Sequence, residues 1–256
     1  MTASIREGSV QADGVAIKYV EAGKGEPVVY LHGAAGLQLT AAHRSLAERN
    51  RIIAFQIPGL DALDEKSPSQ KLTVAANLLS KAVAALGIEG FRLMGHSIGA
   101  DLALRMALGK REAVKSLILI APTAILPPST LAMAKVTAES APAAWFKEDV
   151  SPDLAARRQE VFHALAQQPR DPTLEADMGG IDVPVLVLLG TSDDVVSTDA
   201  ARIFSSLLPK CYTVMIYDAT HDIEADRPEA VADIVGDFLA HGEGFLINRG
   251  NAIINP

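Results

Sequence analysis

Short apolar runs alternate with longer amphipathic segments along most of the chain. Continuous apolar runs occupy residues 27–33, 51–57, 91–95, 115–121 and 183–190, and CYTVMIY follows at 211–217. Runs of this length are typical of strands buried on both faces of a sheet. Segments with helical spacing lie between them, at residues 41–49, 73–86, 99–108 and 197–208. Because strands that alternate with helices form βαβ units, the pattern predicts an α/β fold with a mostly parallel sheet.

The two ends of the chain differ from this repeat. Residues 10–12 and 15–20 are short strand-like runs joined by Asp13-Gly14, a strong hairpin signal, so we expect an antiparallel strand at the N-terminus. A last helix is expected from Pro228 to about Gly242, because proline suits the first helical position. Residues 242–256 have no clear period and are expected to form an extended or loosely docked end. The total is about eight strands.

The alternation stops at Pro122 and resumes near Asp182. The sixty or so residues between them contain helical patterns at 129–140, 142–148 and 152–168 but no strand signal. We interpret residues 122–182 as a small helical insertion that caps a core formed by residues 1–121 and 183–256.

Composition and charge disfavour nucleic-acid-binding and membrane-associated classes of protein. The net charge of −8 and pI of about 5.2 disfavour binding to nucleic acid or to an anionic membrane surface. The N-terminus has no apolar signal region, and no apolar stretch reaches the roughly 18 residues that span a bilayer. Cys211 is the one cysteine and lies in an apolar run, which favours a buried thiol. We therefore expect a cytoplasmic protein; the sequence does not predict an oligomeric state.

The segment GHSIG, residues 95–99, lies between a predicted strand and a predicted helix. This strand–turn–helix context is the test for a G-x-S-x-G nucleophile elbow, in which a strained turn exposes the serine hydroxyl. Ser97 is therefore the candidate nucleophile. A serine hydroxyl needs an adjacent base to attack a carbonyl carbon.

His221 is the favoured base because it follows the apolar run 211–217, where a strand would end. Ligand sites in open α/β sheets lie at the carboxyl ends of the strands. The other histidines are expected to be structural or to lie in surface or packing positions: His32, His43, His96, His163 and His241.

Asp193 is the favoured acid, because it lies just past the strand at 183–190. Its neighbour Asp194 is the alternative. An acid beside the base fixes the histidine tautomer and stabilises the imidazolium.

An oxyanion hole requires backbone N–H groups directed at the developing charge. We expect one from Ile98 and the other from Ala34, with Ala35 as the second choice, in the loop HGAAG. The candidate lining of the substrate pocket is Ala35, His96, Leu126, Trp145, Phe146 and Val195. Such a lining favours an apolar acyl or alkyl group, although the cap residues are also suited simply to pack the cap onto the sheet.

Together these features resemble the α/β-hydrolase fold superfamily, from about residue 15 to residue 239. The resemblance rests on LHGAAG, GHSIG, GTSDDVV and HDIEADRPEA, which occur in the order Ser, Asp, His. It implies Ser97 as nucleophile, Asp193 as orienting acid, His221 as base and residues 122–182 as the cap. The chain departs from the usual pattern at Ala34-Ala35, at FQIPGLDAL and at Thr220, where many relatives have glycine.

Three hypotheses follow for function. The first is a cofactor-free serine hydrolase that cleaves a small carboxylic ester or a related carbonyl compound. The second uses the same three residues as a C–C bond hydrolase, lyase or perhydrolase, because the fold does not fix the reaction. The third is a non-catalytic protein that binds a small molecule. No metal motif such as H-E-x-x-H or C-x-x-C is present in the sequence.

Overall fold

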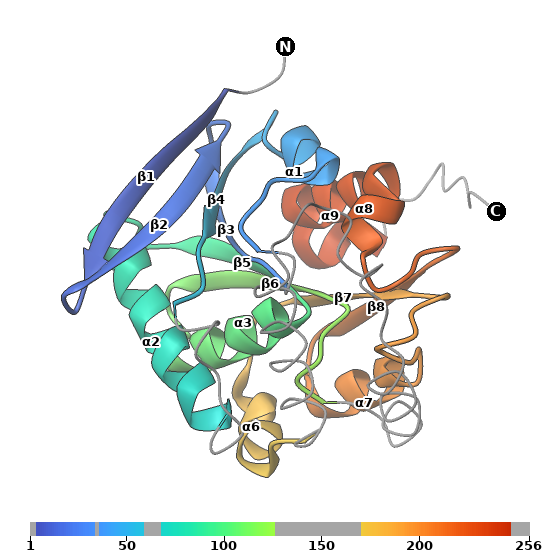
Figure 1. The fold of residues 1–256 in the computed structure, drawn as a ribbon. Helices are drawn as coiled ribbons and strands as arrows, with labels where there is room; N and C mark the ends of the chain where they lie inside the picture. The colour runs from blue at the N-terminus through green and yellow to red at the C-terminus, as the bar shows by residue number, and fades with distance from the viewer. Residues whose placement is uncertain (1–3, 34–35, 59–67, 126–169, 247–256) are drawn as a thin grey trace, which may run out of the picture.

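The computed structural model describes residues 4–33, 36–58, 68–125 and 170–246 (Figure 1). An eight-stranded sheet forms its centre, in the order β1-β2-β4-β3-β5-β6-β7-β8. The strands are β1 Ile5–Ala12, β2 Val15–Ala22, β3 Glu26–Leu31, β4 Asn50–Phe55, β5 Phe91–His96, β6 Val114–Ile120, β7 Val185–Gly190 and β8 Cys211–Ile216. β2 is antiparallel to β1 and to β4, and the remaining neighbours are parallel. The predicted sheet is therefore confirmed, including its antiparallel N-terminal strand.

Helices cover both faces of this sheet (Figure 1). On one face lie α2 Pro68–Ala85, α3 Ile98–Gly109, α6 Pro172–Asp177 with the 3₁₀ turn η3 Met178–Gly180, and α7 Ala200–Leu207. On the other lie α1 Ala41–Leu46, α8 Ile223–Asp226, α9 Pro228–His241 and the 3₁₀ turn η4 Gly242–Leu246. This two-sided cover explains why the central strands are apolar without alternation.

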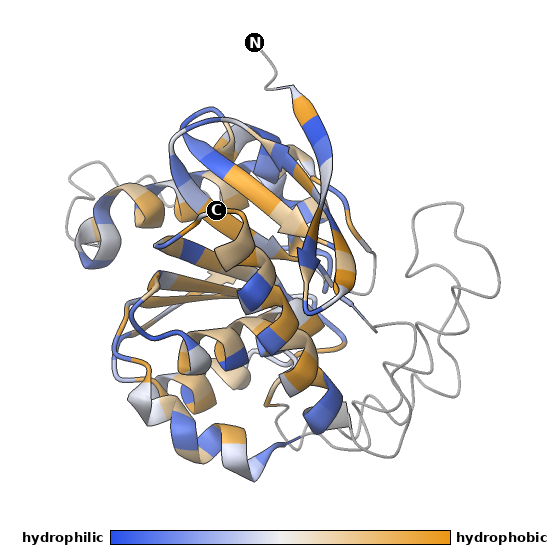
Figure 2. Ribbon diagram, turned by 90° about the vertical axis from the view of Figure 1, so that its left-hand side faces the viewer, coloured by the Kyte–Doolittle hydropathy of each residue, from blue (hydrophilic) through white to orange (hydrophobic). Residues whose placement is uncertain are grey.

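The strand β7 shows how the sheet divides the core. Val185, Val187 and Leu189 pack on the side of α3 and α7, whereas Leu186 and Leu188 pack on the side of α1 and α9. All five side chains are fully buried. Burial of one such side chain contributes about 1.5–3 kcal/mol, so the central strands supply much of the stability. Figure 2 shows the same division, with hydrophobic strands enclosed between helices whose polar positions lie outward.

The N-terminal hairpin turns where the sequence predicts. Asp13 and Gly14 have φ of 48° and 78°, so both central residues are left-handed, as a two-residue hairpin turn of type I′ requires. The register pairs Ala12 with Val15 directly across the turn.

The end of the described chain is more firmly packed than the sequence indicates. Phe245 is 1% exposed, and its ring makes edge contacts with Phe238 in α9 and Tyr212 in β8. The expectation of a loosely docked end is therefore wrong for residues 242–246. Residues 247–256 lie outside the described residues.

The chain leaves and re-enters the described core at adjacent positions. Ile125 and Arg170 form an isolated antiparallel bridge, and the residues between them lie outside the described residues. After Arg170, Asp171 caps α6 by accepting hydrogen bonds from the N–H groups of Thr173 and Leu174. Arg105 of α3 donates to the same carboxylate at 2.9 Å. The division into a core and an insertion at 122–182 stays a prediction.

Candidate active site

Ser97 occupies the turn between β5 and α3, at the carboxyl end of the parallel strands. Its φ is 54° and its ψ is −121°, a conformation that is strained for any residue with a Cβ atom. Its N–H donates to the carbonyl of Ile120 in β6 at 2.8 Å, which helps to hold the turn in place. The side chain is thereby presented above the first turn of α3.

The two glycines of GHSIG are required by backbone crowding. A Cβ atom on Gly99 would lie 2.1 Å from the carbonyl oxygen of Leu31, and one on Gly95 would lie 2.3 Å from that of Gly99. These distances are far below van der Waals contact, and the opposing atoms belong to the backbone. Only glycine therefore allows α3 to approach β3 and β5 this closely.

His221 links the serine to a carboxylate. Its Nε2 lies 2.9 Å from Ser97 Oγ, and its Nδ1 lies 3.1 Å from Asp193 Oδ2. Since a carboxylate only accepts, the Nδ1–H donates to Asp193 and leaves Nε2 free to accept the serine proton. This tautomer is the one that general-base catalysis requires.

Asp193 is held as an anion. Its other oxygen, Oδ1, accepts hydrogen bonds from the N–H groups of Val195 at 2.7 Å and Val196 at 2.9 Å. Burial raises the pKa of Asp193, but the charge and hydrogen bond of His221 and these two N–H groups outweigh burial and lower it from 3.8. Its side chain is fully buried, whereas the His221 ring is 19% exposed. The carboxylate is thus more completely shielded from solvent than the ring.

The pKa of His221 is raised from its ordinary 6.5. Burial acts in the opposite direction, but the charge and hydrogen bond of Asp193 exceed it, and the charges of Asp222 and Asp194 add to them. Asp193 makes the hydrogen-bond contact with the ring, whereas Asp194 acts on the pKa through its charge. The protonated ring is stabilised, which suits a group that must accept a proton during a reaction.

The two loops that carry Asp193 and His221 are joined by their backbones. The N–H of Ser192 donates to the carbonyl of Ala219 at 2.9 Å. A Cβ atom on Gly190 would lie 2.4 Å from the same carbonyl, so glycine lets the loops meet. Thr220, at the position where the family pattern has glycine, donates through its N–H to Asp226 of α8 at 2.9 Å. The loop therefore keeps its shape without that glycine.

Of the other predicted site residues, the structure describes only some. Ile98 is the first residue of α3, so its N–H belongs to the turn that has no acceptor within the helix. Val195 is 2% exposed, and its backbone N–H donates a hydrogen bond to Asp193. Outside the described residues are Ala34, Ala35, Leu126, Trp145 and Phe146.

His96 lies behind His221 and is 6% exposed. Its Nε2 is 2.9 Å from the main-chain carbonyl oxygen of His221, and its Nδ1 is 3.6 Å from Oε2 of Glu224. Its described polar contacts are thus with the His221 loop and with Glu224. Its place in the substrate pocket stays a prediction.

Sequence reasoning missed a buried polar cluster next to His221. Glu224, in α8, is 4% exposed, and its carboxylate accepts a hydrogen bond from Tyr30 OH at 2.9 Å. His43 Nε2 lies 3.1 Å from Glu224 Oε1, although the pair misses hydrogen-bond alignment. The partners come from β3, β5 and α1, so no local pattern in the sequence brings them together.

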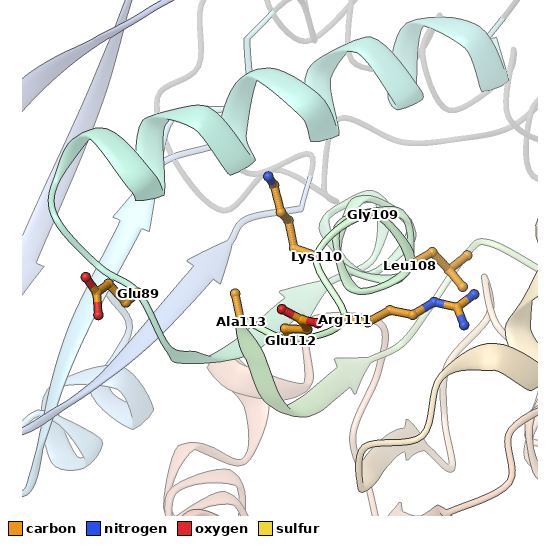
Figure 3. A pocket seen from close by; sticks show the side chains of 7 residues that line it. All are labelled: Glu89, Leu108, Gly109, Lys110, Arg111, Glu112 and Ala113. Carbon is orange, nitrogen blue, oxygen red and sulfur yellow. The ribbon is translucent and has the colours of Figure 1, made fainter.

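A hollow lies away from these residues, at the C-terminal end of α3 (Figure 3). It is an open depression of about 600 Å³, and its lining mixes two acidic and two basic side chains: Glu89, Leu108, Gly109, Lys110, Arg111, Glu112 and Ala113. Because Ser97 is at the opposite end of α3, this hollow is separate from the candidate active site.

Two further properties concern the described part of the chain alone. None of its helices combines the length and the apolar character needed to cross a bilayer. Within the same ranges, no three histidine, cysteine, aspartate or glutamate side chains are grouped to hold a metal ion.

Comparison with known proteins identifies the family. Residues 28–234 match the Alpha/beta hydrolase family, and the chain belongs to it. It is 23% identical to 2-hydroxymuconate semialdehyde hydrolase from a Pseudomonas species, over 93% of this chain and 95% of that protein. It is also 26% identical to polyketide synthase ThaQ from Burkholderia thailandensis over 91% of this chain, but it spans only 12% of the length of that synthase.

Among solved structures, a serine hydrolase from Cycloclasticus zankles has the same fold. The TM-score is 0.73 at 16% identity, and the match covers 93% of this chain and 98% of that one. The family and the fold are thus established for this chain.

Proposed function

We propose that the protein is a serine hydrolase that cleaves a small carboxylic ester or a related carbonyl compound through an acyl-enzyme. The observation that carries this proposal is the unbroken chain of contacts from Ser97 through His221 to Asp193. In this proposal Ser97 is the nucleophile, His221 the general base and Asp193 the orienting acid. A cytoplasmic location stays a prediction from the sequence.

The first half-reaction follows from the tautomer of His221. Ser97 Oγ attacks the substrate carbonyl carbon while its proton moves to His221 Nε2. The charge of Asp193 stabilises the imidazolium that forms, and the N–H of Ile98 stabilises the oxyanion. The tetrahedral intermediate then collapses: the bond to the leaving group breaks, and the leaving oxygen takes the proton from His221. The second oxyanion donor is predicted to be Ala34.

The second half-reaction repeats these steps with water. Water gives a proton to His221 Nε2 and attacks the acyl carbon, and collapse of the second intermediate returns that proton to Ser97 Oγ. The acid product leaves, and the enzyme regains its starting state without a cofactor. The predicted pocket lining favours an apolar acyl or alkyl group.

Labelling with a fluorophosphonate probe, followed by turnover of p-nitrophenyl esters of increasing acyl length, tests the proposal. We expect labelling and turnover in the wild-type protein and loss of both in Ser97→Ala. Ser9→Ala is the matched control, because Ser9 is an exposed serine on β1, far along the chain from the turn. A wild-type protein that neither reacts with the probe nor cleaves any ester of the series would contradict the proposal.

C–C bond hydrolysis by the same residues is the second candidate. The observation that favours it is the match along nearly the whole chain to a relative whose name specifies a semialdehyde, and not an ester, as substrate. Product analysis with a 1,3-diketone separates the two reactions. Cleavage of the diketone without ester turnover would favour the second candidate, whereas a ligand bound and recovered unchanged would favour a binding protein.

A further inference from the structure

The loop that carries His221 is short and is fixed in the core at both ends. Before the base, Ala219 is fully buried, and its carbonyl accepts a hydrogen bond from the N–H of Ser192 at 2.9 Å. After the base, Ile223 at the start of α8 is fully buried as well. Only residues 220–222 lie between these two buried positions, so their own contacts decide how the base is held.

Thr220 is bound by one carboxylate oxygen of Asp226. Its main-chain N–H donates to Asp226 Oδ2 at 2.9 Å, and its hydroxyl donates to the same oxygen at 2.5 Å. Asp226 is the last residue of α8, and its own N–H donates to the carbonyl of Asp222 at 3.0 Å. The helical turn that follows His221 therefore reaches back to the residue that precedes it.

The hydroxyl contact depends on the residue type at position 220, where the family pattern has glycine. A glycine could make the main-chain hydrogen bond to Asp226, but it has no side chain for the second one. Glycine also has a wider choice of backbone conformations than threonine. Thr220 therefore restricts the residue before the base in two ways that glycine would not.

We propose that Thr220 and Asp226 are positioning residues for the base: the carboxylate of Asp226 binds the main-chain N–H and the hydroxyl of Thr220, and this pair of hydrogen bonds keeps the imidazole in line with the nucleophile. The proposal rests on the proposed function in that His221 is taken as the general base.

The geometry of the base makes such positioning necessary. The His221 ring bridges two groups, at 2.9 Å from Ser97 Oγ and 3.1 Å from Asp193 Oδ2, so a shift of its backbone changes both distances. A misplacement of about 1 Å can cost about 10²-fold in rate. Because Thr220 is exposed and Asp226 only half-buried, water replaces part of the lost contact, and we expect a smaller effect.

The first test compares Asp226→Ala with Asp233→Ala. The control removes the same side chain from an exposed position on α9. We expect Asp226→Ala to lower kcat by about tenfold and to leave KM within about twofold, because a misplaced base slows chemistry without weakening substrate binding. Asp233→Ala should keep its kcat. An unchanged kcat in Asp226→Ala, or an equal loss in the two variants, overturns the proposal.

The second test isolates the hydroxyl of Thr220. Thr220→Val keeps the main-chain N–H and loses the hydroxyl, whereas Thr220→Ser keeps both. We expect Thr220→Val to lower kcat by about threefold and Thr220→Ser to retain it. In the Asp226→Ala background, Thr220→Val should cause no further loss, because residues that share one contact are not additive. An equal loss in the serine and valine variants, or losses that multiply, overturns the proposal, and the serine–valine pair decides it even if Asp226→Ala does not fold.

The pH profile separates positioning from an effect of charge. Burial lowers the pKa of His221, but nearby carboxylates outweigh burial and raise it, namely Asp193, Asp222 and Asp194. We expect Asp226→Ala to leave the half-maximal pH of kcat/KM at its wild-type value, since this residue acts through the backbone of the loop. A shift as large as that in Asp194→Asn would show that Asp226 acts by its charge and would overturn the proposal.

A further test does not depend on activity. Proton NMR detects the Nδ1–H of His221 at low field when it donates to Asp193. We expect this signal in the wild-type protein and in Thr220→Ser, and its broadening or loss in Asp226→Ala. An unchanged signal in Asp226→Ala overturns the proposal. Absence of Ser97 labelling and ester turnover in the wild-type protein, by contrast, contradicts the proposed function and leaves this spectrum to decide how the ring is held.

Discussion

Asp193 and His221, which are 28 residues apart in the chain, meet at 3.1 Å between Oδ2 and Nδ1. The N–H groups of Val195 and Val196 hold the other carboxylate oxygen, so Asp193 is fixed from both sides. We expect Asp193→Asn to lower kcat by about 10⁴-fold, because an amide NH₂ at this site favours the wrong tautomer of His221. Asp194→Asn is the matched control and should retain kcat within about tenfold. Steady-state kinetics on one ester distinguish them; a larger loss in Asp194→Asn would assign the acid role to that residue.

The rate should depend on pH through His221. The base must be neutral in the free enzyme, and its pKa is raised above 6.5 by Asp193, with Asp222 and Asp194 contributing. Activity therefore falls as pH decreases through this raised pKa, and the half-maximal point of kcat/KM lies above pH 6.5. Asp194→Asn removes one of the negative charges and should move this point to lower pH. Asp182→Asn changes an exposed residue near the other end of β7 and should not move the half-maximal point. A half-maximal point below pH 6.5 in the wild-type protein would contradict a raised pKa of His221.

Backbone crowding at the elbow predicts a stability difference between two glycines of α3. Gly99→Ala forces a Cβ atom to within 2.1 Å of the Leu31 carbonyl oxygen, whereas nothing lies within 4 Å of a Cβ atom at Gly109. We expect Gly99→Ala to lower the free energy of unfolding by about 3 kcal/mol or more. Gly109→Ala should be neutral or stabilise α3 by up to about 1 kcal/mol. Denaturant unfolding monitored by circular dichroism measures both; similar stabilities would show that α3 can move away from β3.

The packed end of the chain offers a separate test of the fold. Phe245 is 1% exposed between Phe238 and Tyr212, whereas Val74 of α2 is 59% exposed. We expect Phe245→Ala to cost about 3 kcal/mol of unfolding free energy, because it leaves a cavity beside α9. Val74→Ala should change stability by less than about 0.5 kcal/mol. Thermal unfolding by calorimetry compares the two variants, and an equal effect would mean that η4 does not contribute to the core.

Sequence patterns predicted the structure correctly where a short segment determines its own backbone conformation. The apolar runs predicted the strands, Asp13-Gly14 predicted the hairpin turn, and Gly95 with Gly99 marked the elbow around Ser97. These predictions succeed because burial on both faces, a left-handed turn and a close backbone contact each restrict the residue types within a few positions. The loops just past the predicted strands were also expected to gather at one edge of the sheet, because the carboxyl ends of parallel strands lie there.

The short elements were not predictable in this way. α8 is four residues long, and its sequence IEAD has no helical period to detect. Phe245 lies in a segment without a pattern, and its burial depends on ring contacts with β8 and α9. Such segments take their structure from the surfaces that they meet.

The sequence by itself determined the strands, the elbow and the likeness to the hydrolase family, since each is carried by patterns within short segments of the chain. Only the tertiary structure decided that Asp193 contacts His221 and that Glu224 lies buried against His96, Tyr30 and His43. These contacts join residues that are 28 to 194 positions apart. Their physical basis is the loss of water around charged groups, which depends on packing from several elements at once.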